Sequence, residues 1–144
     1  LMNICSIHIK IDLFYFFCYN DYGDYMDIFC KIVNGEIPSY TIYEDDIVKC
    51  FLDINPVNTG HLLIIPKEHT LDITTISDDT LMHIKKIALE MKSLVEERLN
   101  CDGVTFIQNN GISQEVKHYH LHLIPKYENE IKMDVKEVFD ILTK

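Results

Sequence analysis

Residues 117–127, KHYHLHLIPKY, alternate imidazole and apolar side chains. The imidazoles belong to His118, His120 and His122, and the apolar side chains belong to Tyr119, Leu121 and Leu123. Alternate side chains of a β-strand share a face, so the histidines are expected to project together and the apolar residues into a core. The stretch therefore predicts a strand with one buried face and one face that carries chemistry.

Three neighbouring imidazoles leave three interpretations open. A single histidine on a strand is usually structural, but three together repel one another when protonated, so a cluster is costly unless it binds something. Histidine is a common zinc ligand. An imidazole can also attack phosphorus while its neighbours donate hydrogen bonds to the phosphoryl oxygens.

The segments on either side of this strand predict an α+β fold. Residues 78–100 repeat apolar side chains every three or four positions, which is typical of a helix with one buried stripe. Short β-branched runs separated by turn residues predict strands elsewhere. The other expected elements are a short helix at 27–35, a hairpin over 39–54 with an acidic turn at Asp45 and Asp46, strands at 61–66, 103–110 and 116–125, and a weak helix at 134–144. An antiparallel sheet with one main helix laid across it accounts for this order.

Size, charge and cysteine content narrow the class of protein. The 144 residues fit one domain with a sizeable core. A net charge of −10 disfavours duplex nucleic acid as the main partner, because binding to a polyanion uses a broad positive field. The five cysteines are odd in number and scattered, which indicates free thiols in a reducing compartment. We expect a cytoplasmic protein, with the nucleus as a second location.

The first 25 residues are expected to form an extension of unknown role. Their apolar patches are interrupted by His8, Lys10 and Asp12, so the run is too short and too charged to span a bilayer. No membrane partner is therefore expected. The domain itself is expected to cover residues 26–144, including a C-terminal tail.

The histidine stretch resembles the H-x-H-x-H signature of the histidine triad (HIT) superfamily of nucleotide hydrolases and transferases. Three further segments look, in order, like the Hint-type branch of that superfamily, the nucleoside phosphoramidases. These segments are DIFCKIVNGEIPSYTIYEDD at 27–46, FLDINPVNTGHLLIIPKEH at 51–69 and FIQNNG at 106–111. The resemblance runs from Asp27 to Tyr127, about two-thirds of the chain.

This resemblance implies a HIT-like five-stranded antiparallel sheet with one main helix and a short N-terminal helix, and a sheet extended across a homodimer. It implies hydrolysis of the P–N bond of purine nucleoside 5′-phosphoramidates, of the AMP-amine or AMP-lysine type, through a nucleotidyl-histidine intermediate. His120 would be the nucleophile, His122 the phosphate donor, His118 a buttress and His61 a fourth histidine of the site. No metal cofactor is implied for this reaction, because a protonated amine is a good leaving group.

The resemblance also assigns nucleotide-binding residues. Phe29, Ile32, Phe51 and Ile54 would sandwich the base, and Asp53 would hold the ribose hydroxyls. From the pattern alone, these residues are as easily a core with a turn aspartate. The nearest matches to the family's phosphate-binding loop are Asn109 (or Asn110), Ser113, Gln114 and Glu115.

Two departures from the family pattern stand out. The loop NNGISQEVKH is two residues shorter than the N-x-G-x-x-x-G-Q pattern and lacks its second glycine. Some relatives carry C-x-x-C that joins histidines in a structural zinc site, and here Asp27 replaces the first cysteine. Cys30 and His69 remain as partners of a weakened zinc site, which we do not favour over a metal-free arrangement.

Two other functions stay open. A dinucleoside polyphosphate hydrolase of the fragile-histidine-triad type shares the same triad. A nucleotide-binding dimer with little turnover fits the shortened loop.

Overall fold

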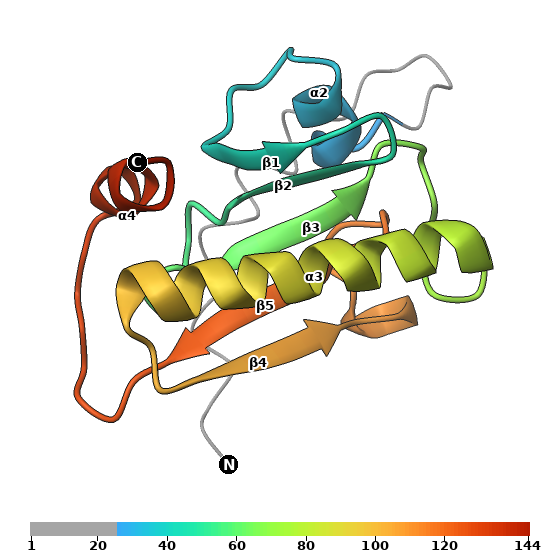
Figure 1. Ribbon diagram of the computed structural model, residues 1–144. Helices are drawn as coiled ribbons and strands as arrows, with labels where there is room; N and C mark the ends of the chain where they lie inside the picture. Colours follow the sequence, from blue (N-terminus) through green and yellow to red (C-terminus); the bar gives the residue numbers. More distant parts are fainter. Residues whose placement is uncertain (1–25) are drawn as a thin grey trace.

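The structure is a computed structural model that describes residues 26–144, so the expected extension at 1–25 lies outside the described residues. One five-stranded sheet forms its centre, and a long helix lies across one face of the sheet (Figure 1). The elements in chain order are α2 (Ile28–Val33), β1 (Thr41–Glu44), β2 (Val48–Leu52), β3 (Leu62–Pro66), α3 (Asp78–Leu99), β4 (Gly103–Gln108), the 3-10 turn η3 (Gly111–Ser113), β5 (Leu121–Lys126) and α4 (Val135–Leu142). The predicted α+β fold with five strands is confirmed.

The strands lie in the order β1-β2-β3-β5-β4, and each neighbouring pair is antiparallel. β3 and β5 meet near the middle of the sheet, where Leu63 pairs with His122. Directly paired residues share a face, and so do residues two positions apart on one strand. His61, two residues before Leu63, is therefore directed to the same face as His122.

Both faces of the central strands are covered, which explains why β2 and β3 are buried at every position. Odd and even positions separate cleanly in β3, with Leu62 and Ile64 packing beneath α3 and Leu63 and Ile65 packing on the opposite face. The opposite face is closed by α2, which adds Phe29 and its neighbours to a second, smaller apolar cluster. This second face carries the histidines.

α3 follows its predicted bounds closely. The Ser77 side chain accepts a hydrogen bond from the Thr80 N–H, which caps the helix, and Asp78 and Asp79 occupy the positive end of the helix dipole. The helix ends at Asn100, whose left-handed backbone (φ 50°) suits asparagine. The buried stripe of α3 covers the larger apolar cluster.

The other local predictions hold as well. Asp45 turns the β1–β2 hairpin by accepting hydrogen bonds from the N–H groups of Ile47 and Val48, both at 2.8 Å. The predicted tail helix is α4, which begins with a capping box between Asp134 and Glu137. Cys30, Cys50 and Cys101 carry free thiols. Within residues 26–144, no helix is both long and apolar enough to cross a bilayer.

The predicted strand over 116–125 is wrong at its start, because β5 begins only at Leu121. Its neighbour β3 ends at Pro66, and the Tyr119 N–H donates to the Thr70 carbonyl at 2.6 Å instead of joining a ladder. The backbone nevertheless keeps alternating. Tyr119 is buried beneath α3, whereas the rings of His118 and His120 contact Phe29 on the other face.

Candidate active site

The four predicted histidines lie together on the face closed by α2. His61, one residue before β3, places its Nε2 at 2.9 Å from Nδ1 of His122 in β5. The rings of His120 and His122 stack edge to face with centroids 4.8 Å apart. His118 joins them through its backbone, since its carbonyl oxygen lies 2.7 Å from Nδ1 of His120.

A chain of hydrogen bonds fixes the protons of His61 and His122. The Val57 N–H donates to Nδ1 of His61 at 3.2 Å, so a neutral His61 carries its proton on Nε2. That Nε2–H donates to Nδ1 of His122, which places the proton of His122 on its own Nε2. His122 is thereby prepared as a hydrogen-bond donor.

The opposite arrangement holds for His120. Its Nδ1–H donates to the His118 carbonyl, so Nε2 keeps a lone pair, which is what a nucleophile requires. The ring is buried and packs edge to face against Phe29, with centroids 5.3 Å apart. A donor and a lone pair are therefore held two residues apart on one face.

The three rings are held neutral by their surroundings. Burial lowers the pKa of His122 to about 3, and the nearby His120 and His61 act in the same direction. Burial also lowers the pKa of His61, although Asp53, with Oδ2 3.7 Å from Nδ1, opposes this effect. Burial likewise lowers the pKa of His120. At neutral pH each of these rings therefore carries one N–H donor and one lone pair.

His118 is fully buried and held at both ring nitrogens. Nε2 lies 2.9 Å from the Pro66 carbonyl oxygen, and Nδ1 lies 3.2 Å from Oδ2 of Asp27. Asp27 also caps α2, because its Oδ1 accepts hydrogen bonds from the N–H groups of Phe29 and Cys30 at 2.8 and 2.9 Å. Its contacts fit the role of a buttress predicted for His118.

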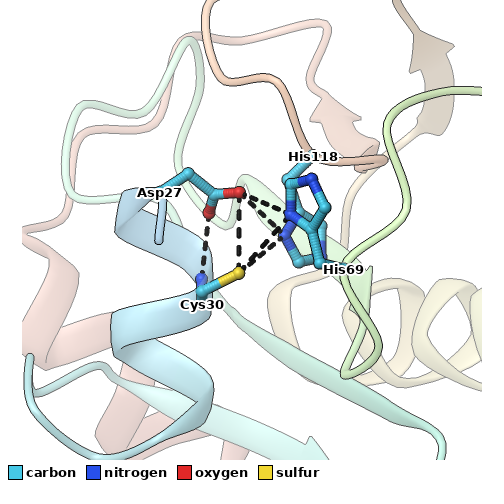
Figure 2. A group of neighbouring side chains, drawn as sticks. All are labelled: Asp27, Cys30, His69 and His118. Carbon is cyan, nitrogen blue, oxygen red and sulfur yellow. Dashed lines mark hydrogen bonds and ion pairs between the residues drawn. The ribbon is translucent and has the colours of Figure 1, made fainter. Parts of the chain in front are cut away.

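Asp27, Cys30, His69 and His118 form a second group of neighbouring polar side chains (Figure 2). Oδ2 of Asp27 lies 3.0 Å from Nδ1 of His69, and Sγ of Cys30 lies 3.5 Å from the same nitrogen. Burial raises the pKa of Asp27, but the hydrogen bonds with His118 and the Cys30 backbone and the charges of the two histidines outweigh it, so the net pKa is below its ordinary value. The half-exposed ring of His69 contacts the ring of His118, with centroids 5.2 Å apart.

The predicted base-binding residues divide into two sets. Phe29, Ile32 and Phe51 are buried in the smaller apolar cluster, and the Phe29 and Phe51 rings pack edge to face at 5.8 Å. Ile54 lies apart from them with 63% of its surface exposed. Asp53 caps a turn, because its Oδ1 accepts a hydrogen bond from the Asn55 N–H at 2.9 Å.

The predicted phosphate loop contains a 3-10 turn, η3, which the sequence analysis did not anticipate. Asn109, the residue after β4, is half-buried, and Ser113 is exposed. Gln114 is buried and donates to the Leu71 carbonyl at 2.7 Å, while its Oε1 has no hydrogen-bond partner among the described residues. The charge of Glu115 acts on His120, raising the pKa of that ring against the effect of burial.

Sequence reasoning missed three groups that hold the histidines. The Val57 N–H and the Pro66 carbonyl are backbone groups, so no side-chain pattern reveals them. The third is the carboxylate of Asp27, whose contact with His118 spans 91 positions. The one sequence signal for a role of Asp27 was its position three residues before Cys30 in the segment DIFC.

A comparison with protein families gives a match to the HIT domain over residues 34–129. The chain belongs to the HIT domain family. The matched region contains all four histidines of the site and ends soon after β5. It begins after α2, so Asp27 and Cys30 lie before it.

Individual relatives agree with this assignment. A HIT-like protein of Methanocaldococcus jannaschii is 47% identical over 109 residues, which cover 73% of this chain and 82% of that protein. An adenosine 5′-monophosphoramidase of Candida albicans is 43% identical over 105 residues, covering 69% of each chain. The crystal structure of a zinc-bound histidine triad family protein from Mycobacterium smegmatis superposes with a TM-score of 0.75 at 33% identity, covering 81% of this chain and 89% of that one.

Proposed function

We propose that this protein is a nucleotide hydrolase that cleaves the P–N bond of purine nucleoside 5′-phosphoramidates through a nucleotidyl intermediate on His120. Membership of the HIT family and relatives named adenosine 5′-monophosphoramidase support the coarser assignment, a HIT-family hydrolase. The observation that carries the finer one is the pair of opposite tautomers, with a lone pair on Nε2 of His120 and a proton on Nε2 of His122.

In the first step, Nε2 of His120 attacks the α-phosphorus, and the P–N bond to the amine breaks. The electron pair leaves with the nitrogen, which takes up a proton from solvent and departs as the amine. Positive charge develops on the attacking ring, and its Nδ1–H bond to the His118 carbonyl stabilises that charge. His122 donates its Nε2–H to a phosphoryl oxygen, where negative charge accumulates.

In the second step, water attacks the same phosphorus and gives up a proton to solvent, and the P–Nε2 bond breaks. The nucleoside monophosphate leaves, and His120 returns to its neutral form. The base would pack against the apolar cluster of Phe29, Ile32 and Phe51 that adjoins the histidines, and Asp53 would accept hydrogen bonds from the ribose hydroxyls.

The test is turnover of an AMP-amine conjugate by wild type and His120→Asn. Loss of the nucleophile is expected to lower kcat by about 10⁴-fold or more. His83→Asn is a suitable control, because His83 pairs with Asp45 away from the other histidines. Retained turnover in His120→Asn, with circular dichroism unchanged, contradicts the assignment.

The same assay separates the two alternatives. Faster hydrolysis of diadenosine triphosphate than of the AMP-amine conjugate favours a dinucleoside polyphosphate hydrolase. Tight AMP binding without hydrolysis of either compound favours a nucleotide-binding dimer.

We also propose that a second copy of this chain packs against α3 and β4. β4 is an edge strand, and four large apolar side chains are exposed around it: Met82, Leu89, Phe106 and Ile107. A hollow of about 430 Å³ lies between α3 and β4 beside them. Phe106→Asp is expected to give a monomer in analytical ultracentrifugation, whereas Ile112→Asp, at an exposed residue of η3, is expected to leave a dimer.

A further inference from the structure

The tail that follows β5 returns along the end of the sheet to α4 (Figure 1). On its way it makes three hydrogen bonds to Thr59, a buried residue in the turn between β2 and β3. The Thr59 hydroxyl donates to the Ile131 carbonyl at 2.7 Å and accepts from the Met133 N–H at 3.3 Å. The Tyr127 hydroxyl donates to the Thr59 carbonyl at 2.9 Å. One residue of the turn therefore fastens it to the tail.

The same turn holds the ring of His61. The Val57 N–H donates to Nδ1 of His61 at 3.2 Å, and the His61 N–H donates to the Asn58 carbonyl at 3.1 Å. The first of these bonds places the proton of a neutral His61 on Nε2. Thr59 lies between Asn58 and His61 in the chain, so the tail holds the segment that orients this ring.

We propose that Thr59 is a positioning residue, through which the tail fixes the ring of His61 and thereby the proton on Nε2 of His122. Thr59 acts through these histidines and contacts no substrate in the proposed scheme. The kinetic consequence of this role rests on the proposed hydrolysis, whereas the arrangement of the two rings does not.

The outer part of the turn depends on such an anchor. Residues 54–57, which include the donor at Val57, are all exposed, and the chain becomes buried at Thr59. Asn58 adds one further bond, from its Nδ2 to the Pro125 carbonyl at 3.0 Å. A turn without buried side chains at its tip is held mainly by the bonds at its base. Movement at Thr59 therefore reaches the Val57 N–H directly.

The tail also forms a wall behind the histidines. A cavity of about 10 Å³ is lined by Asp53 and His61 from the turn and by Met133 and Val138 from the tail and α4. Val138 is buried in the larger apolar cluster, so α4 anchors the far end of the tail. Ile131 and Met133 lie after residue 129, where the match to the HIT domain ends. The contact with Thr59 thus adds a segment beyond the matched region to the support of the site.

The chemistry of the contact requires a hydroxyl. The Thr59 side chain donates one hydrogen bond and accepts another, which serine can reproduce and valine cannot. Thr59→Val keeps the shape of the side chain and leaves the Ile131 carbonyl and the Met133 N–H without this partner. Thr59→Ser keeps both bonds.

The experiment compares these two variants of the full chain by long-range proton–nitrogen NMR of the histidine rings, which distinguishes the two tautomers. Wild type and Thr59→Ser are expected to show the Nε2–H tautomer at His61 and His122. Thr59→Val is expected to show mixed tautomers at both rings. Thr143→Val is the matched control, because it removes a hydroxyl bond to the Phe139 carbonyl at the exposed end of α4. It is expected to keep the wild-type ring signals.

Turnover of an AMP-amine conjugate is the second measurement. In Thr59→Val, kcat is expected to fall about fivefold, the rate equivalent of one ordinary hydrogen bond, with KM changed less than about twofold. Thr59→Ser and Thr143→Val are expected to keep kcat within about twofold of wild type. Tyr127→Phe removes the third bond to Thr59 and is expected to change the ring signals in the same direction as Thr59→Val, by a smaller amount.

The inference is overturned if folded Thr59→Val keeps the wild-type ring signals, or if Thr59→Ser loses as much as Thr59→Val does. Should Thr59→Val fail to fold, Tyr127→Phe decides in its place, and unchanged ring signals there overturn the inference. The ring signals are recorded without substrate, so they test Thr59 separately from the reaction. Absence of turnover in wild type contradicts only the proposed function.

Discussion

The pair His61–His122 and the pair His69–His118 have nearly the same spacing, with ring centroids 5.1 and 5.2 Å apart. Their neighbours differ. The first pair accepts a hydrogen bond from the Val57 N–H at Nδ1 of His61, and the His61 Nε2–H in turn donates to Nδ1 of His122, which leaves the proton of His122 on its Nε2. The second pair faces a carboxylate and a thiol. The first arrangement leaves the Nε2–H of His122 to donate a hydrogen bond to a substrate, and the second holds His118 against the start of α2.

Within 118–122, the difference depends on which ring nitrogen faces which partner. His118 directs Nδ1 to Asp27 and Nε2 to a backbone carbonyl, whereas His122 directs Nδ1 to another imidazole. Both residues lie on the same face of the molecule. His118 and His122 therefore share their residue type and their face, and they differ in the hydrogen-bond partners that come from other segments.

Among the tests of these two pairs, the largest expected effect is on kcat, measured in variants that each lack one ring of a pair. His122→Asn is expected to lower kcat on an AMP-amine conjugate by about 10²–10³-fold, the usual cost of removing one donor to a developing oxyanion. His69→Asn removes no group that reaches the phosphate in this scheme, so kcat is expected to change less than about threefold. Equal losses in the two variants contradict the division between the pairs.

Gly60, the residue before His61, tests how closely the chain packs at the entry to β3. Its backbone has φ of +87°, and a Cβ there would lie 2.5 Å from a methyl carbon of Leu99. Gly60→Ala is expected to lower the free energy of unfolding by about 2–4 kcal/mol, from left-handed strain and overpacking together. Urea denaturation measures this loss. Gly103→Ala, with nothing within 4 Å of the added Cβ, is expected to be close to neutral.

His61 is expected to act as a positioning residue for His122. His61→Phe removes the Nε2–H that fixes the tautomer of His122, and kcat is expected to fall about 10-fold, a change of about 1.4 kcal/mol. Because the phosphate donor would then titrate without its partner, the pH profile of kcat is expected to shift as well. A change in KM alone, with kcat and its pH profile unchanged, argues against this role.

The most gradual expected effect is a dependence of stability on pH. The folded-state pKa of His122 is about 3, below its ordinary value of 6.5, and that of His61 is also lowered. Between these values the unfolded chain binds more protons than the folded one, so stability falls as pH drops from 6.5 towards 3 and is level above 6.5. His122→Asn is expected to flatten this slope in chemical denaturation at a series of pH values.

Much of the fold was predictable because local rules govern it. The stripe of α3, its Ser77 cap and the acidic turn at Asp45 all depend on residues within a few positions of one another. The strand boundary at Leu121 was not predictable, since it depends on the Tyr119 N–H meeting the Thr70 carbonyl in another segment. The 3-10 turn after Asn110 was likewise missed.

The sequence by itself determined that the three histidines share a face, because successive side chains point to opposite sides wherever the backbone is extended. Together with its other motifs, it also indicated the family. Only the tertiary structure decided where each proton lies and which imidazoles form pairs, because the partners come from remote positions: Val57 for His61, Asp27 and Pro66 for His118. Hydrogen bonds between distant segments carry no signature in local spacing, and they give different surroundings to histidines that share one residue type.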